Sequence, residues 1–293
     1  MQQVQFSNYQ TPEIMELKTR EPAVSGKFYP GDKEDLIAMI QKLAQRMVPV
    51  HTDVSEKTIL GSIVPHAGYI YSARHATPFF QILSEHEPAP DTIVILCPNH
   101  YGYGPPLALD SNISWKTPLG KVDLDHEFYP LLNLDIAPEA HQLEHSAEVM
   151  LPLLQFFLKK PFTILPISMR DQTPQTALLL AKKILKANEK LNKKIAVIAS
   201  SDFSHYISPE EGKVLDDKVL EKIREWDTEG VFTAICQDDI SVCGFGPIMT
   251  LMEMAKQSMK NPGIEILSRG HSGETYPSPE VVHYISAVVY EKS

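Results

Sequence analysis

The feature of this sequence that most constrains its fold is the alternation of short β-branched runs with longer segments of helical periodicity. Runs of this length and composition are typical of buried strands. They lie at residues 60–64, 92–96, 163–167, 195–199 and 281–290. Strands that alternate with helices form βαβ units. The sequence therefore predicts a single α/β domain with a largely parallel or mixed central sheet flanked by helices.

The helices between these runs are predicted from residues that favour helix N-termini. Asp32 is placed to accept a hydrogen bond from the first turn of an amphipathic helix that extends to Met47. Proline in the first turn marks three further starts. These are Thr173-Pro174, Ser208-Pro209 and Pro247, the last of which opens a helix over residues 248–257.

The acidic composition of the chain argues against partners that carry many phosphate groups. The chain has 27 basic and 37 acidic residues, a formal net charge of −10, and no long run of lysine or arginine. A surface that binds phosphates needs clustered positive charge, so nucleic acid and anionic membranes are not expected as partners. The sequence has no apolar run of about 18 residues and no signal-peptide pattern, which predicts a cytoplasmic protein.

Polar side chains of metal-binding type follow three of the predicted strands. His66 and His100 follow the first two, and Asp202 and His205 follow the fourth. The carboxyl ends of parallel strands lie along one edge of a sheet, so these residues are expected to converge there. A fourth segment, the glycine-rich loop before a predicted helix, contributes Cys243. His66, His100 and Cys243 would form a three-ligand metal site with open positions.

The donor types indicate which metals suit this site. Two imidazoles and a thiolate favour iron(II), zinc or copper over magnesium and calcium. His205 is the natural group to transfer protons, with Asp202 orienting it. The other cysteines, Cys97 and Cys236, have no partner nearby in the sequence and are interpreted as structural thiols.

A second pattern competes with this site. His141, Glu144 and His145 match the H-x-x-E-H string, in which one helix presents two zinc-binding histidines and a glutamate base. That pattern would indicate a zinc hydrolase. The hypothesis requires a continuous helix, yet Ser146 is a better N-cap for a helix that begins at Ala147.

Six sequence blocks occur in an order that matches one known family. They are REPAVSGKFYP at residues 20–30, PHAGY at 65–69, PNH at 98–100, EHSAE at 144–148, SSDFSHY at 200–206 and CG at 243–244. In this order they resemble the Memo family, named for a mediator of ErbB2-driven cell motility. Its prokaryotic members are called AmmeMemoRadiSam system protein B. The match implies a Memo-like domain over residues 19–293, preceded by an N-terminal tail of residues 1–18.

The resemblance implies a fold similar to class III extradiol dioxygenases, which hold non-haem iron(II) through two histidines and a carboxylate. Family positions that bind metal match His66, His100 and Cys243. The acid/base histidine and its neighbouring aspartate match His205 and Asp202. Another histidine that lines the family's pocket matches His145, which completes the set of residues expected to act in catalysis.

One matched position departs from the dioxygenases. Cys243 stands where they have a carboxylate, and a thiolate makes the site more attractive to copper. The main hypothesis is therefore a redox-active metal protein with iron(II) as the expected metal, copper or zinc as alternatives, and an unknown small molecule or peptide as partner. The second hypothesis is a non-catalytic module that binds a peptide, or a protein of an associated radical-SAM system, in the same crevice.

Overall fold

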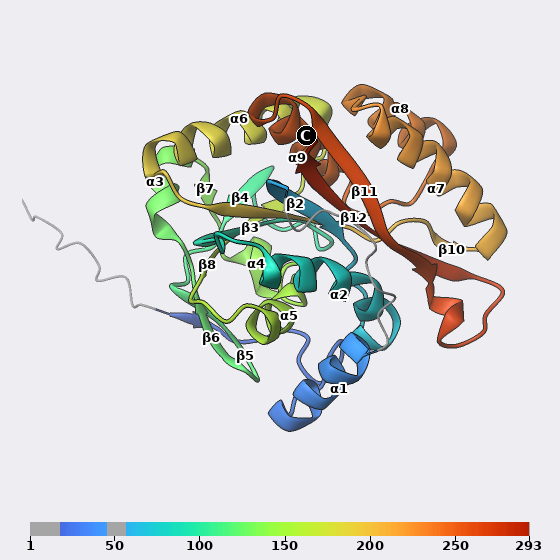
Figure 1. The fold of residues 1–293 in the computed structure, drawn as a ribbon, viewed down its shortest axis with the longest axis horizontal. Helices are drawn as coiled ribbons and strands as arrows, with labels where there is room; N and C mark the ends of the chain where they lie inside the picture. Colours follow the sequence, from blue (N-terminus) through green and yellow to red (C-terminus); the bar gives the residue numbers. More distant parts are fainter. Residues whose placement is uncertain (1–17, 46–56, 293) are drawn as a thin grey trace, which may run out of the picture.

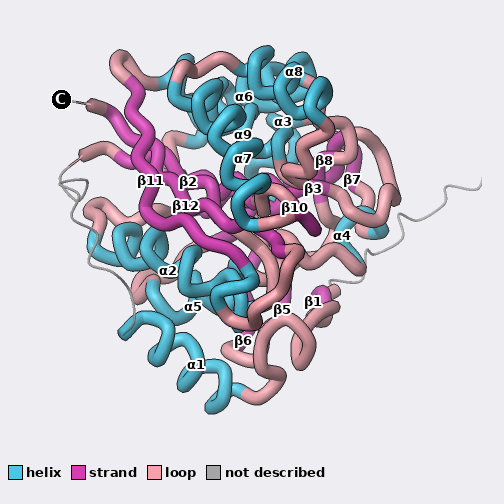
Figure 2. Tube along the Cα trace, turned by 90° about the vertical axis from the view of Figure 1, so that its right-hand side faces the viewer, coloured by secondary structure: helices cyan, strands magenta, loops and turns pink. Residues whose placement is uncertain are grey.

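A mixed β-sheet separates two layers of helices (Figures 1 and 2). The computed structural model describes residues 18–45 and 57–292. In spatial order the sheet contains β10 (His205–Ile207), β12 (Val281–Glu291), β2 (Ile59–Val64), β9 (Ile195–Ser200), β3 (Thr92–Pro98), β8 (Thr163–Met169), β4 (Leu107–Leu109) and β7 (Asp135–Ile136), while β11 (Pro262–His271) pairs with β12. The predicted α/β domain with a mixed, helix-flanked sheet is confirmed.

The centre of the sheet is parallel. β2 pairs with β9, β9 with β3, and β3 with β8, all in parallel. Their carboxyl ends therefore lie along one edge. β12 runs antiparallel to β2, and β4 runs antiparallel to β8. The predicted strands are present, and this arrangement is consistent with the dioxygenase-like fold that the resemblance implies.

Each face of the sheet is covered by one helical layer (Figure 2). Val94 and Leu96 of β3 pack in one hydrophobic core, and Ile93 and Ile95 pack in the other, because successive side chains of a strand point to opposite faces. The first core includes residues of α3 (Tyr129–Leu132), α6 (Pro174–Leu191), α7 (Pro209–Arg224), α8 (Thr228–Asp238) and α9 (Phe245–Ser258). The second includes residues of α1 (Lys33–Gln45), α2 (Tyr69–Glu85) and α5 (Met150–Phe157).

The predicted N-caps of three helices are confirmed. Asp32 accepts a hydrogen bond from the Asp35 N–H at 3.0 Å, and Thr173 and Ser208 cap α6 and α7 in the same way. α9 begins at Phe245, three residues before the predicted start, because a proline is tolerated within a first helical turn. Met47, the predicted end of the first helix, lies outside the described residues, as do residues 1–17 of the expected tail.

A smaller sheet joins the beginning of the described chain to its middle. It consists of β1 (Thr19–Arg20), β5 (Ser114–Thr117) and β6 (Gly120–Asp123), with β1 parallel to β5. This pairing brings the segment after residue 20 toward the carboxyl edge of the large sheet. Within the described ranges, no helix has the length and apolar character needed to cross a membrane.

Candidate metal centre

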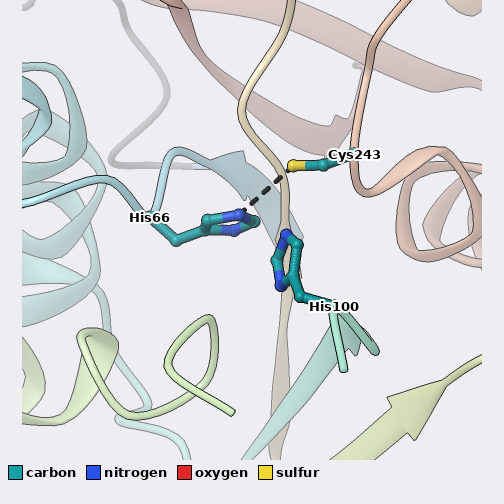
Figure 3. Close-up of side chains that lie close together, drawn as sticks. All are labelled: His66, His100 and Cys243. Carbon is teal, nitrogen blue, oxygen red and sulfur yellow. Dashed lines mark hydrogen bonds between the residues drawn. The ribbon is translucent and has the colours of Figure 1, made fainter. Parts of the chain in front are cut away.

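Three side chains with metal-binding atoms meet at the carboxyl edge of the parallel strands (Figure 3). His66 lies two residues after β2, His100 two residues after β3, and Cys243 two residues before α9. Their ligand atoms all lie within 4.8 Å of one another. Nε2 of His66 is 3.2 Å from Sγ of Cys243. The fold thus brings together the three residues that the strand ends and the glycine-rich loop indicated.

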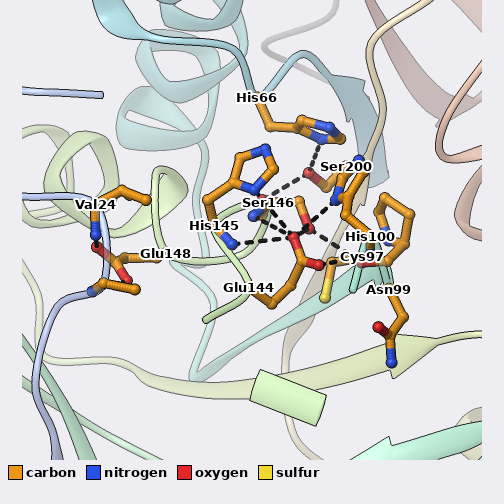
Figure 4. Close-up of polar contacts among 12 residues, drawn as sticks. Val24, His66, Cys97, Asn99, His100, Glu144, His145, Ser146, Glu148 and Ser200 are labelled. Carbon is orange, nitrogen blue, oxygen red and sulfur yellow. Dashed lines mark hydrogen bonds and ion pairs between the residues drawn. The ribbon is translucent and has the colours of Figure 1, made fainter. Parts of the chain in front are cut away.

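A chain of hydrogen bonds determines the tautomer of His66 (Figure 4). The Ser200 hydroxyl donates to the Ser146 carbonyl at 2.7 Å, so its oxygen accepts from Nδ1–H of His66, also at 2.7 Å. Nε2 therefore carries the lone pair that faces Cys243. Burial and the adjacent His100 hold the pKa of His66 well below its ordinary value. A neutral imidazole with a free Nε2 is the form that binds a metal.

Glu144 has the corresponding role for His100. Its Oε1 lies 2.9 Å from Nδ1 of His100, and its Oε2 accepts the His100 backbone N–H at 2.8 Å. The Ser146 hydroxyl and two backbone N–H groups also donate to Oε1. Burial raises the pKa of Glu144, but the hydrogen bond and charge of His100, followed by His145, outweigh it and lower the pKa to about 2. The ionised carboxylate accepts Nδ1–H and leaves Nε2 of His100 free.

Cys243 completes the triangle from the start of α9. Its Sγ accepts a hydrogen bond from the Asp202 N–H at 3.2 Å. Burial and the nearby charge of Asp202 raise the pKa of this thiol well above its ordinary value. The next residue, Gly244, sets its position, since an added Cβ would lie 2.2 Å from the Ser200 carbonyl oxygen. Only glycine allows α9 to start this close to the end of β9.

His145 forms a wall beside the two candidate histidine ligands. Its ring stacks on His100 with centroids 4.7 Å apart and meets His66 edge-on at 5.4 Å. The centroid of the Phe28 ring lies 4.7 Å from that of His145. Burial lowers the pKa of His145 to about 4, so the ring is neutral at pH 7. With His100 and Glu144 it makes a second group of ligand atoms within 4.8 Å of one another.

Asp202 and His205 line a cavity together with His66, His100 and His145. Asp202 Oδ1 accepts the His66 N–H at 2.7 Å, and burial raises the pKa of this carboxyl to about 7. His205 donates Nδ1–H to the Ser241 carbonyl at 2.7 Å, which leaves Nε2 as an acceptor. In the described residues the hydrogen bond that orients Nδ1 of His205 thus comes from Ser241 and not from Asp202. Ser241, which the sequence did not indicate, holds the ring.

The competing H-x-x-E-H pattern lacks the helix that it requires. α4 (Glu139–Gln142) is a single turn that ends before Glu144, and α5 begins at Met150 rather than at the predicted Ala147. The Ser146 hydroxyl donates to Glu144 instead of capping a helix. His141 is buried with Nε2 3.0 Å from a backbone carbonyl, and among the described residues it belongs to neither ligand group. Glu144 and His145 thus join the site without His141.

A buried carboxylate attaches the N-terminal segment to the site. Glu148 forms an ion pair with Arg20 at 2.7 Å and accepts the Tyr29 hydroxyl at 2.8 Å. The backbone N–H groups of Ala23 and Val24 donate to the same carboxylate (Figure 4). This attachment positions Phe28 against His145, which is a structural role for two of the six sequence blocks.

A cavity of about 640 Å³ opens beside the histidines. His66, His100, His145, Asp202 and His205 line its inner part. The fold and site thus define a class: an α/β protein with a candidate three-ligand metal centre at the carboxyl edge of its sheet, beside a cavity large enough for a small molecule.

Comparisons with known proteins identify the family. A family model described as Memo-like protein matches residues 20–288. The MEMO1 family protein of Methanococcoides burtonii is 36% identical over 274 residues, which cover 92% of this chain and 99% of that protein. Those of Sulfurisphaera tokodaii and Ignicoccus hospitalis are 39% and 40% identical over 91% and 92% of this chain, and 98% of each relative. The chain therefore belongs to the Memo family, as its six sequence blocks predict.

Proposed function

We propose that the protein is a metal-dependent redox protein that holds iron(II) or copper through His66, His100 and Cys243. The observation that carries this proposal is the convergence of two free Nε2 atoms with Sγ of Cys243. Ser200 and Glu144 form hydrogen bonds with Nδ1 of His66 and His100. In known metal sites, bonds of this kind orient the ligating imidazoles. A mixed nitrogen and sulfur donor set suits iron(II), copper and zinc, and the first two support redox chemistry.

A bound metal would supply a redox-active Lewis acid with open positions for a substrate. The remaining steps belong to side chains of the cavity. Burial lowers the pKa of His205, so its neutral Nε2 can accept a proton from a substrate, and the Ser241 carbonyl stabilises the resulting cation. Asp202, with a pKa of about 7, can hold or release a second proton. His145 and Phe28 limit the access of water to the ligands.

Metal content tests the first part of this proposal. Protein purified without oxygen or an affinity tag should contain about one iron or copper per chain, or take it up on reconstitution. Cys243→Ala and His100→Ala should lose the metal and keep the fold. Cys236→Ala is the matched control, because Cys236 is an exposed free cysteine. Full occupancy in both site variants would refute the ligand set, and failure of reconstitution would favour the non-catalytic binding module.

Dioxygen consumption tests the redox part. With catechol or ascorbate as the reductant, the metal-loaded protein should consume dioxygen, whereas His100→Ala should not. His205→Gln should retain the metal, and its rate of dioxygen consumption should fall about 100-fold. A general acid–base group usually contributes at least this much. His126→Gln is a control, because His126 is exposed and lies outside the cavity. An unchanged rate in His205→Gln would exclude the proton-transfer role.

A further inference from the structure

The outer part of the cavity has an aromatic wall assembled from separate segments. Tyr71 lies in the first turn of α2, Tyr206 in β10, and Tyr276 in the connection between β11 and β12, at the lower right of Figure 1. The rings of Tyr71 and Tyr276 pack edge to face with centroids 5.8 Å apart. Phe28 also lines the cavity and packs against His145. Aromatic faces bind flat rings by stacking and organic cations through their π electrons.

Tyr206 adopts an unusual backbone conformation at the mouth of this cavity. Its φ is 57°, in the left-handed region that is unfavourable for a bulky side chain. Its side chain is 74% exposed, so packing in the core does not explain the choice of residue. Strained backbone is enriched at binding and catalytic sites. The free-energy cost of the Tyr206 backbone conformation is consistent with a ring that contacts a ligand.

The charged side chains that line the cavity favour a cationic ligand over an anionic one. Among the described residues that line it, none is a lysine or arginine, whereas Asp202 is buried inside and Glu280 is exposed at the rim. The Glu280 carboxylate has no ion-pair partner in the described part of the chain. An anionic group that enters past the rim would meet no cationic side chain. A cationic group would meet aromatic faces and a carboxylate.

We propose that this cavity binds a small arylalkylamine, with its aromatic ring against the tyrosine wall and its ammonium group facing Glu280. The inner end of such a ligand would reach the candidate metal centre, and this part rests on the proposed function. The contacts with the tyrosines and with Glu280 need no metal. Chelator-treated protein should therefore already discriminate among ligands by their charge.

Three probes with the same phenol ring isolate the charge: tyramine is a cation, 4-ethylphenol is neutral, and 4-hydroxyphenylacetate is an anion. Calorimetric titration of chelator-treated protein should give a Kd for tyramine about tenfold below that for 4-ethylphenol, with the anion weakest. Glu280→Gln should abolish the preference for tyramine and leave 4-ethylphenol unchanged. Glu189→Gln, an exposed change on α6, is the matched control. Tyr276→Ala should weaken the binding of tyramine and 4-ethylphenol.

Three results would overturn the inference: no binding of any probe at millimolar concentration, equal or tighter binding of the anion in the chelator-treated protein, or a preference for tyramine that survives Glu280→Gln. The metal content of a reconstituted portion of the same sample separates the two proposals. Protein that binds tyramine but takes up no metal refutes the redox proposal alone. Protein that takes up metal but binds none of the probes refutes the ligand class alone.

Discussion

Glu144 holds both the ring and the backbone of His100, with Oε1 2.9 Å from Nδ1 and Oε2 2.8 Å from the main-chain nitrogen. One carboxylate therefore fixes the position and the tautomer of a residue 44 positions away. The direction in which Nε2 of His100 points is set by these two bonds (Figure 4).

Replacing Glu144 with Gln should weaken metal binding about 10- to 100-fold, because a neutral amide offers one acceptor oxygen where the carboxylate offers two. Competition with a fluorescent chelator measures this affinity. Glu139→Gln, an exposed change on the neighbouring α4, should leave it unaltered. Equal affinities in Glu144→Gln and wild type would contradict an orienting role.

Two buried serines of the sheet provide a matched pair. Ser200→Ala removes the acceptor of His66 Nδ1–H and should lower metal affinity about tenfold. Ser168→Ala removes a hydroxyl on β8 that is buried without a hydrogen-bond partner in the described residues, so metal affinity should stay the same and stability should not fall. The same chelator competition, with thermal unfolding, measures both effects. Equal losses of affinity would assign the effect to general disturbance of the sheet.

Metal binding should release about one proton per chain at pH 7. The Cys243 thiol is protonated without a metal, because burial raises its pKa, and ligation requires the thiolate. Calorimetry in buffers with different ionisation enthalpies counts the protons released. Cys236→Ala should give the same number. If no proton is released, the thiolate must already be present before the metal binds.

Gly244→Ala should disrupt the contact that positions Cys243. The added Cβ would lie 2.2 Å from the Ser200 carbonyl oxygen, so α9 must shift, at a cost of about 2–3 kcal/mol in the free energy of unfolding. Metal affinity should fall as well. Gly31→Ala is the control, since its Cβ would have no neighbour closer than 3.4 Å. Urea unfolding of both variants measures the difference, and equal stability would show that α9 adapts without cost.

His75 should make the fold acid-sensitive. It is 4% exposed, and burial, followed by the charge of Arg74, lowers its pKa from 6.5 to about 3. The unfolded chain binds more protons between these values, so stability falls as pH falls through this range. From pH 6.5 to 5 the contribution of His75 is about 2 kcal/mol. His75→Gln should lose that much less stability over this interval in urea unfolding. An identical loss would assign the acid sensitivity to other groups.

The central strands could be predicted from the sequence because they are buried on both faces. Ile93, Val94, Ile95 and Leu96 form an unbroken apolar run for this reason. β11 has no such signal, since most of its residues are half-exposed and it includes Arg269. The small sheet was missed because its strands have only two to four residues.

The candidate ligands could be selected because each follows a strand end or precedes a helix. The groups that hold these residues in place by hydrogen bonds could not be selected from the sequence. The contact between Glu144 and His100 depends on an irregular turn after α4, which no periodicity predicts. The Ser241 acceptor is a backbone carbonyl, which any residue could supply. The sequence therefore indicates the chemistry of a site more readily than the hydrogen bonds that orient it.

The place of β12 in the sheet has a consequence for biosynthesis. β2, which leads directly to His66, lies between β9 and β12. While a ribosome adds the rest of the chain at about 5 to 20 residues per second, one edge of β2 stays without its partner for on the order of tens of seconds. A nascent chain needs protection of that apolar edge from aggregation. Truncation before residue 281 would remove the neighbour of the strand that presents His66.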